Sequence, residues 1–180
     1  MAGTHVALLR GINVGRAKRV AMADLRALVT ALGYLDVRTL LNSGNIVFTA
    51  PRAARGDPGA RIEQAIAKRL GVTTRVTVLT AQELAAIVRD NPLRQHAGEP
   101  SRLQVAVLSD SADRARLKPL AGRDWAPEAL AVGGRACYLW CPRGQIESPV
   151  AEAVGRALGD AVTTRNWATI TKLHLLASGG

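Results

Sequence analysis

The stretch that decides the fold lies near the N-terminus, where residues 4–15 are THVALLRGINVG. Its first part, Thr4–Arg10, holds the continuous apolar run Val6-Ala7-Leu8-Leu9, which predicts a central β-strand. The strand leads into a glycine loop, Gly11–Gly15, and then into a basic segment. We therefore expect the first strand of a sheet with a glycine loop at its end.

The elements that follow complete a repeating unit. They are a helix with apolar positions from Met22 to Leu32 closed by Gly33, strands at Val37–Leu41 and Ile46–Thr49 joined through Asn42-Ser43-Gly44-Asn45, a helix from Ile62 to a stop at Gly71, and a strand at Val76–Leu79. Glycine after a helix and Asn or Gly in a hairpin are typical because both tolerate positive φ. The order strand, helix, strand, strand, helix, strand is that of the split βαβ, or ferredoxin-like, plait.

The second half of the chain repeats this order. A linking helix starts at Thr80, where Glu83 completes a capping box, and stops before Asn91-Pro92. The elements after it are a strand at Leu103–Leu108, a helix at Ala112–Leu120, a hairpin of Ala129–Val132 and Ala136–Cys141, a helix at Val150–Leu158, a strand near Ala161–Thr164 and a last helix at Trp167–Ala177. The last helix is apolar round most of its circumference, so we expect it to be buried.

The predicted fold class is α+β, with two ferredoxin-like plaits in tandem, a linking helix and a C-terminal helix. We expect the first half to span residues 1–80, the linking helix and loop residues 81–100, and the second half with the C-terminal helix residues 101–180. Each half alone is too small to bury a generous core.

Composition excludes several classes of protein. The chain has 180 residues, of which 48% are hydrophobic and 21% charged, which is ordinary for a globular protein and excludes wholesale disorder. It contains no apolar run as long as a membrane-spanning helix needs and no signal-peptide pattern. Two cysteines without an export signal indicate a reducing compartment. We expect a cytoplasmic protein that has no membrane partner.

The charge is strongly basic, with a formal net charge of +10. Residues 1–90 carry 13 basic and 6 acidic residues, and the basic residues are densest at Arg10, Arg16, Lys18 and Arg19. Such an excess favours anionic partners. A solvated basic surface, inflated by an arginine-rich codon set, is the alternative explanation.

The plait brings separate motifs to one end of its sheet, namely the loop after the first strand, the hairpin and the loop before the fourth strand. The last of these holds Thr73, Thr74 and Arg75. Turn amides make anion-binding concavities, and an arginine adds a planar fork for phosphate or carboxylate. The candidate ligand-binding residues are Arg10, Gly11, Asn13, Gly15, Asn42, Ser43 and Asn45, together with Lys172 near the C-terminus. The alternative is that the glycines and asparagines serve turn geometry alone.

Other kinds of site find little support. His5, His96 and His174 lie far apart in the sequence, so no metal site is predicted. Cys137 and Cys141, four apart in a predicted strand, are separated by about 13 Å, too far for a disulfide, and we expect them in the core. Walker, dinucleotide and nucleophile-elbow motifs are absent, and no cofactor is expected.

Base stacking on the open sheet is also disfavoured. RNA-binding plaits stack bases on exposed aromatic residues of the central strands, which here offer only His5 and Phe48. Trp167 is predicted to anchor the core. Binding to a phosphate backbone requires only cations and is compatible with the sequence.

Four motifs carry a resemblance over essentially the whole chain: ALLRGINVG at the start, the hairpin NSGNIVF, TAQELAAIV in the linking helix and RNWATITKL near the end. They resemble the bacterial family catalogued as domain of unknown function number sixteen ninety-seven. The resemblance implies a small cytosolic protein of paired α/β plaits and supplies no activity. One departure is Arg16, which stands where the family's opening loop is expected to continue with a second glycine after Gly15.

The function that the sequence favours is a basic module that binds an anionic ligand, either a nucleic-acid backbone or a phosphorylated metabolite, through the Arg10–Arg19 loop and the Asn42–Asn45 hairpin. Two alternatives stay open. One is a small metal-independent enzyme that acts in a cleft between the halves, using Lys172 among other side chains for electrostatic stabilisation. The other is a self-associating scaffold, so that the chain is a monomer or a homodimer.

Overall fold

The structure is a computed structural model that describes residues 2–16 and 19–179. The chain divides into two compact units, one formed by Met1–Leu84 with Leu173–Gly180 and the other by Ala85–Lys172. Lys18, predicted to belong to the basic segment, lies outside the described residues.

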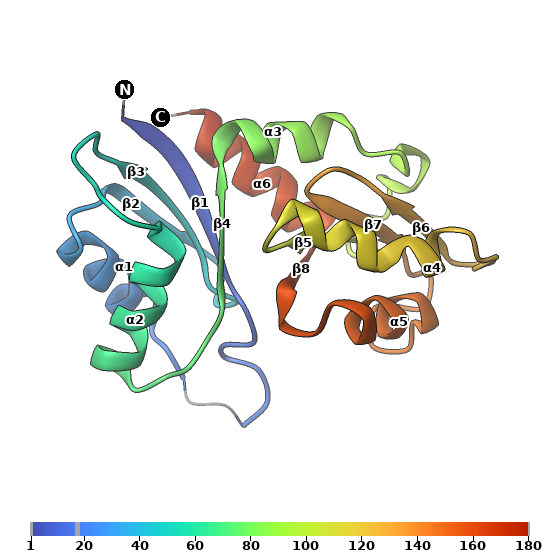
Figure 1. Cartoon of the computed structure of the whole chain (residues 1–180), viewed down its shortest axis with the longest axis horizontal. Helices are drawn as coiled ribbons and strands as arrows, with labels where there is room; N and C mark the ends of the chain where they lie inside the picture. The colour runs from blue at the N-terminus through green and yellow to red at the C-terminus, as the bar shows by residue number, and fades with distance from the viewer. Residues whose placement is uncertain (1, 17–18, 180) are drawn as a thin grey trace. The chain divides into compact units, whose positions relative to one another are not determined.

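The first unit contains a four-stranded antiparallel sheet with the order β2-β3-β1-β4 (Figure 1). Its strands are β1 (Gly3–Leu9), β2 (Leu35–Leu40), β3 (Asn45–Ala50) and β4 (Val76–Thr80). The central strand β1 pairs Val6 with Val47 of β3 on one side and with Leu79 of β4 on the other. This order confirms the predicted ferredoxin-like plait.

Helices α1 (Met22–Ala31) and α2 (Pro58–Leu70) pack on one face of this sheet. Helix α2 begins where the carboxylate of Asp57 accepts a hydrogen bond from the Ala60 amide at 2.7 Å, and it ends at Gly71, whose φ is +63°. The core between the helices and the sheet includes the fully buried side chains of Leu25, Phe48, Ile62 and Ile66. Burial of these side chains is the main stabilisation of the unit.

Helix α3 (Ala81–Arg89) follows β4 directly and confirms the predicted linking helix. Its capping box is complete, because the Glu83 amide donates to Thr80 Oγ1 at 3.1 Å and the Thr80 amide donates to Glu83 Oε2 at 2.8 Å. A short 3-10 turn, η1 (Arg94–His96), lies in the loop that leads to the second plait.

The second unit repeats the sheet, with the strand order β6-β7-β5-β8. Its elements are β5 (Leu103–Leu108), β6 (Ala129–Val132), β7 (Ala136–Trp140), α5 (Pro149–Leu158), the 3-10 turn η3 (Gly159–Ala161) and β8 (Val162–Asn166). The core on one face of the sheet includes the buried side chains of Leu108, Leu117, Leu139 and Val154. On β7, the Tyr138 hydroxyl donates to the main-chain oxygen of Ile87 at 2.7 Å and so holds α3 to the strand.

The helix predicted at Ala112–Leu120 is a 3-10 helix, η2 (Ser111–Leu117), followed by one short α-helical turn, α4 (Lys118–Ala121). The predicted helix is therefore confirmed in position, and most of it has 3-10 rather than α-helical geometry. Pro119 explains the difference, because it has no N–H for the Ala115 carbonyl and its ring would clash with that carbonyl in an α-helix. The tighter 3-10 geometry avoids this conflict.

The C-terminal helix α6 (Trp167–Ser178) is confirmed, but it is not buried all round. Trp167, Ile170 and Leu173 are buried, whereas Leu175 is 71% exposed. No helix in the described part of the chain is both long and apolar enough to cross a membrane.

Candidate functional site

Main-chain hydrogen bonds bring the three predicted segments together at one end of the first sheet. The Leu9 amide donates to the Gly44 oxygen of the hairpin at 2.9 Å, and the Arg10 amide donates to the Arg75 oxygen at 2.9 Å. The Thr74 hydroxyl, which is buried, donates to the Arg10 oxygen at 2.8 Å. The loop after β1, the hairpin and the loop before β4 thus form one surface, as the plait topology predicted.

The backbone of the loop after β1 alternates in the sign of φ. Gly11, Asn13 and Gly15 have φ values of +66°, +56° and +57°, whereas Ile12 and Val14 between them do not have positive φ. Backbone that alternates between left- and right-handed conformations turns successive N–H groups into a concavity that suits an anion. Within the described residues, the main-chain N–H groups of residues 11–16 donate no hydrogen bond to the protein.

The side chain of Asn13 holds this loop in place. Its Nδ2 donates to the main-chain oxygens of Val20 at 2.9 Å and of Asn42 at 2.8 Å, and its Oδ1 accepts from the Val20 amide at 2.7 Å. Both protons of the amide are therefore used within the protein. The structure gives Asn13 a positioning role, because it ties the middle of the Gly11–Gly15 run to Val20 further along the chain and to Asn42 of the hairpin.

Gly44 brings the hairpin against the loop. A Cβ on Gly44 would lie 2.7 Å from Ile12 Cδ1 and 2.9 Å from Leu9 Cβ, and the residue has a φ of +81°. Ile12 is 3% exposed and extends from the otherwise exposed loop into the core. Only glycine combines this backbone conformation with such a close approach.

Exposed arginines surround the loop. Arg10, Arg16, Arg19 and Arg75 are all exposed at this end of the sheet. Arg19 donates from its guanidinium to the main-chain oxygen of Asn13 at 2.6 Å, and Arg75 lies 3.9 Å from the carboxylate of Glu63. Arg16 has no hydrogen bond or ion pair within the described residues.

The predicted hairpin residues differ from one another in exposure. Asn42 is exposed and Ser43 half-buried, whereas Asn45 is completely buried. The amide nitrogen of Asn45 donates to the Leu40 oxygen at 2.7 Å and to Ser43 Oγ at 2.9 Å. The arrangement indicates that Asn45 stabilises the turn. The pattern of Asn and Gly could not separate this role from ligand contact.

The C-terminal helix carries the remaining candidate ligand-binding residue. Lys172 is exposed on α6, in the second compact unit. Among the histidines, His5 stacks on Phe48 and His96 stacks on Trp140, with ring centroids 5.5 and 4.1 Å apart. The described residues contain no group of three or more histidine, cysteine or acidic side chains that could hold a metal ion.

Both cysteines are free and buried, as predicted. Burial raises the pKa of the Cys137 thiol to about 12 and also raises the pKa of Cys141. Such thiols stay protonated at neutral pH and do not act as nucleophiles. Their place is in the core, on the face of the second sheet that is covered by α5.

Comparison with solved structures shows the fold of this chain in another bacterial protein. The chain is similar to the conserved bacterial protein SP0830 from Streptococcus pneumoniae, with a TM-score of 0.76 and 20% identity over 98% of this chain and 99% of the other. At this identity the match shows the shared fold. No curated protein matches the sequence.

The family comparison covers most of the chain. Residues 2–138 match the family described as "Protein of unknown function (DUF1697)". This match includes the glycine loop, the hairpin and the linking helix, which carry three of the four motifs noted in the sequence. The chain belongs to the DUF1697 family.

Proposed function

We propose that this protein is a binding module for phosphate groups, and that the loop Arg10–Arg19 and the hairpin Asn42–Asn45 form its site. The observation that carries the proposal is the alternating backbone of Gly11–Gly15, whose N–H groups have no partner within the described residues. Amides arranged in this way stabilise a bound anion without any side-chain charge. Here Asn13 holds them in place before a ligand arrives.

The charge around the loop supports the same ligand class. Residues 10–20 contain four basic residues and no acidic residue. Arg10 and Arg16 are exposed at the two ends of the Gly11–Gly15 run, where a guanidinium adds two-point contacts to phosphate oxygens. Arg16 replaces a residue without charge in the expected family pattern, so this chain should bind phosphate more strongly than relatives with glycine there.

Two sources of the phosphate group are compatible with this chemistry: the backbone of a nucleic acid and a phosphorylated metabolite. Stacking of bases on the sheet finds no support, because Phe48 is fully buried and His5 stacks against it. A nucleic acid would therefore be bound through its phosphates alone, with strong salt dependence and little sequence preference. A role for Lys172 stays a prediction.

The test combines two probes on the full chain. Binding of glycerol 3-phosphate is followed through the amide resonances of residues 11–16, and binding of single-stranded oligothymidine through fluorescence anisotropy at several salt concentrations. The double variant Arg16→Ala/Arg19→Ala should weaken the binding of both probes and lower the salt slope for the single-stranded oligonucleotide by about 1.4 units. The matched control is Arg52→Ala/Arg55→Ala, which removes the same charge from the loop beyond the other end of β3.

The outcomes separate the two sources. Oligothymidine binding that falls linearly with the logarithm of salt concentration, and that depends on Arg16 and Arg19, identifies a nucleic-acid backbone. Amide shifts with glycerol 3-phosphate but no retention of the oligonucleotide identify a phosphorylated small molecule. Absence of both effects at low salt, or equal losses in the control variant, would overturn the proposal.

A further inference from the structure

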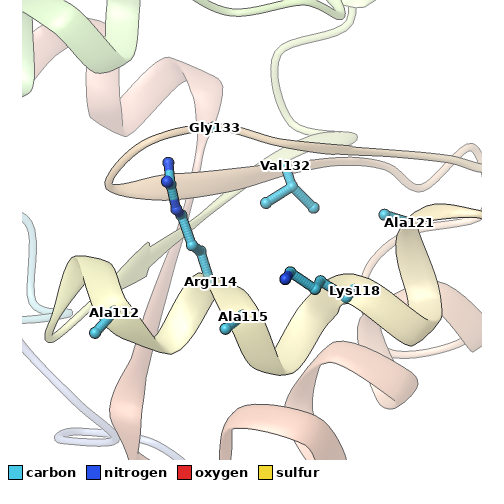
Figure 2. A pocket seen from close by; sticks show the side chains of 7 residues that line it. All are labelled: Ala112, Arg114, Ala115, Lys118, Ala121, Val132 and Gly133. Carbon is cyan, nitrogen blue, oxygen red and sulfur yellow. The ribbon is translucent and has the colours of Figure 1, made fainter.

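The second unit contains a hollow of about 430 Å³ between its helical segment and the end of its hairpin. One wall is formed by η2 and α4, and the other by the end of β6 (Figure 2). The lining residues are Ala112, Arg114, Ala115, Lys118, Ala121, Val132 and Gly133. This volume is in the range of sites for small molecules.

Two cations line this hollow. Arg114 and Lys118 are four residues apart on the helical wall; the Arg114 side chain rises from it toward the hairpin, whereas the Lys118 side chain runs along the helical segment below Val132 (Figure 2). Neither side chain makes a hydrogen bond or ion pair with any residue that the structure describes. Among the residues that the structure describes, no acidic side chain lines the hollow.

Two neighbouring arginines differ from Arg114 and Lys118, because their side chains interact with the rest of the protein. Arg116 lies 3.3 Å from the carboxylate of Asp113, and Arg135 donates to the main-chain oxygens of Leu108 and Ser109 at 2.9 and 3.1 Å. The side chains of Arg114 and Lys118 form no such interaction with the described residues, and both line the same hollow. Two positive charges on one wall attract an anion.

The rest of the lining is apolar and built from small side chains. Three alanines, Ala112, Ala115 and Ala121, leave open the space that larger side chains would fill, and Val132 covers it from the strand. No aromatic side chain of the described part of the chain lines the hollow, so a nucleobase would find no stacking partner there. The lining suits a compact apolar group attached to an anionic one.

We infer that this hollow is a second binding site, specific for a small organic anion. Arg114 and Lys118 hold its phosphate or carboxylate group, and its apolar part lies over Ala115 and under Val132. The site is built entirely from residues 112–133 of the second unit and does not depend on the glycine loop of the first.

Phenyl phosphate is a suitable probe, because it combines a dianion with a compact apolar ring, and benzyl alcohol is its neutral counterpart. A nuclear magnetic resonance titration of the full chain should shift the amides of residues 112–121 and 132–133 with phenyl phosphate and leave them nearly unchanged with benzyl alcohol. Arg114→Gln and Lys118→Gln should each weaken this binding by about tenfold or more, the usual effect of losing a charged hydrogen bond. Both residues are exposed, so these variants keep the fold.

Three further variants sharpen the test. Arg116→Gln removes a charge from the same segment outside the lining and should leave affinity unchanged. Ala115→Leu should fill the hollow and weaken phenyl phosphate more than inorganic phosphate. Arg16→Ala/Arg19→Ala should not change the shifts in residues 112–133, so failure of the loop site and failure of this site are distinguishable.

The inference is overturned by any of three results. The first is a set of shifts confined to residues 11–16, and the second is equal affinity for phenyl phosphate and benzyl alcohol. The third is unchanged affinity in both Arg114→Gln and Lys118→Gln.

Discussion

Asn13 and Asn42 are 29 residues apart in the sequence, yet the side-chain amide of Asn13 donates to the main-chain oxygen of Asn42 at 2.8 Å. This bond ties the glycine loop to the hairpin. The same side chain exchanges two hydrogen bonds with the main chain of Val20 and so closes the loop on itself. The backbone conformation of the proposed phosphate site therefore depends on the side chain of Asn13.

Replacement of Asn13 tests this dependence. Asn13→Ala should lower the free energy of unfolding by about 1–3 kcal/mol, because hydrogen-bonding groups lose their partner and alanine is strained at positive φ. Asn13→Gly relieves the backbone strain but loses the same hydrogen bonds. Its free energy of unfolding should therefore lie between those of Asn13→Ala and the original chain. Urea denaturation measures the free energy of unfolding of both variants. Phosphate affinity that survives Asn13→Ala unchanged would contradict the positioning role.

Gly44 is predicted to be the most sensitive glycine of the site. Gly44→Ala should lower the free energy of unfolding by about 2–4 kcal/mol, because the new methyl group would overlap Ile12 and the backbone is left-handed. Gly33 is the matched control, since its φ is +89° and no heavy atom lies within 4 Å of an added Cβ. Gly33→Ala should cost about 1–2 kcal/mol. Equal losses of unfolding free energy at both positions would show that the close approach of Gly44 to Ile12 does not affect stability.

Arg10 is predicted to contact the phosphate directly. Arg10→Ala should weaken phosphate binding by about 1.5–3 kcal/mol, measured by calorimetry on the folded variant. Arg10→Lys should recover only part of the affinity, because an ammonium group lacks the planar two-point contact. A loss of stability without a loss of affinity would assign Arg10 to the fold instead.

Asn45 is expected to behave in the opposite way. Its buried amide donates to Leu40 and Ser43, so Asn45→Ala should lower the free energy of unfolding by about 1–3 kcal/mol. Phosphate affinity, measured under conditions where the variant is folded, should be unchanged. An affinity loss larger than the stability loss would place Asn45 in contact with the ligand.

The buried thiol of Cys137 makes stability sensitive to alkaline pH. Its pKa is raised to about 12 in the folded chain, against about 8.5 for an unfolded thiol. Stabilisation by the neutral thiol is thus complete below about pH 8.5 and is lost as pH rises toward 12, at roughly 1.4 kcal/mol per pH unit. Urea denaturation between about pH 7.5 and pH 10 should show this fall, and Cys137→Ala should reduce its slope. An identical slope in both proteins would contradict the prediction.

Local signals in the sequence were sufficient to predict the order of helices and strands. The apolar run Val6–Leu9 predicted the central strand, Gly71 the end of α2, and Thr80 with Glu83 the start of α3. Each depends on a residue's own conformational preference or on neighbours within one helical turn, which the sequence states directly. The plait topology then placed the glycine loop, the hairpin and the loop before β4 at one end of the sheet.

Tertiary contacts decided the role of each candidate site residue. The same amide side chain braces a loop at Asn13, is exposed at Asn42 and is buried in a turn at Asn45. In the sequence Arg114 and Lys118 resemble any other basic residues, and only the fold places them beside a hollow whose opposite wall carries Val132. Amino-acid type determines which hydrogen bonds and charges a side chain can offer. Which of them are satisfied within the protein, and which are left for a ligand, depends on segments far away in the sequence, and only the folded chain brings these together.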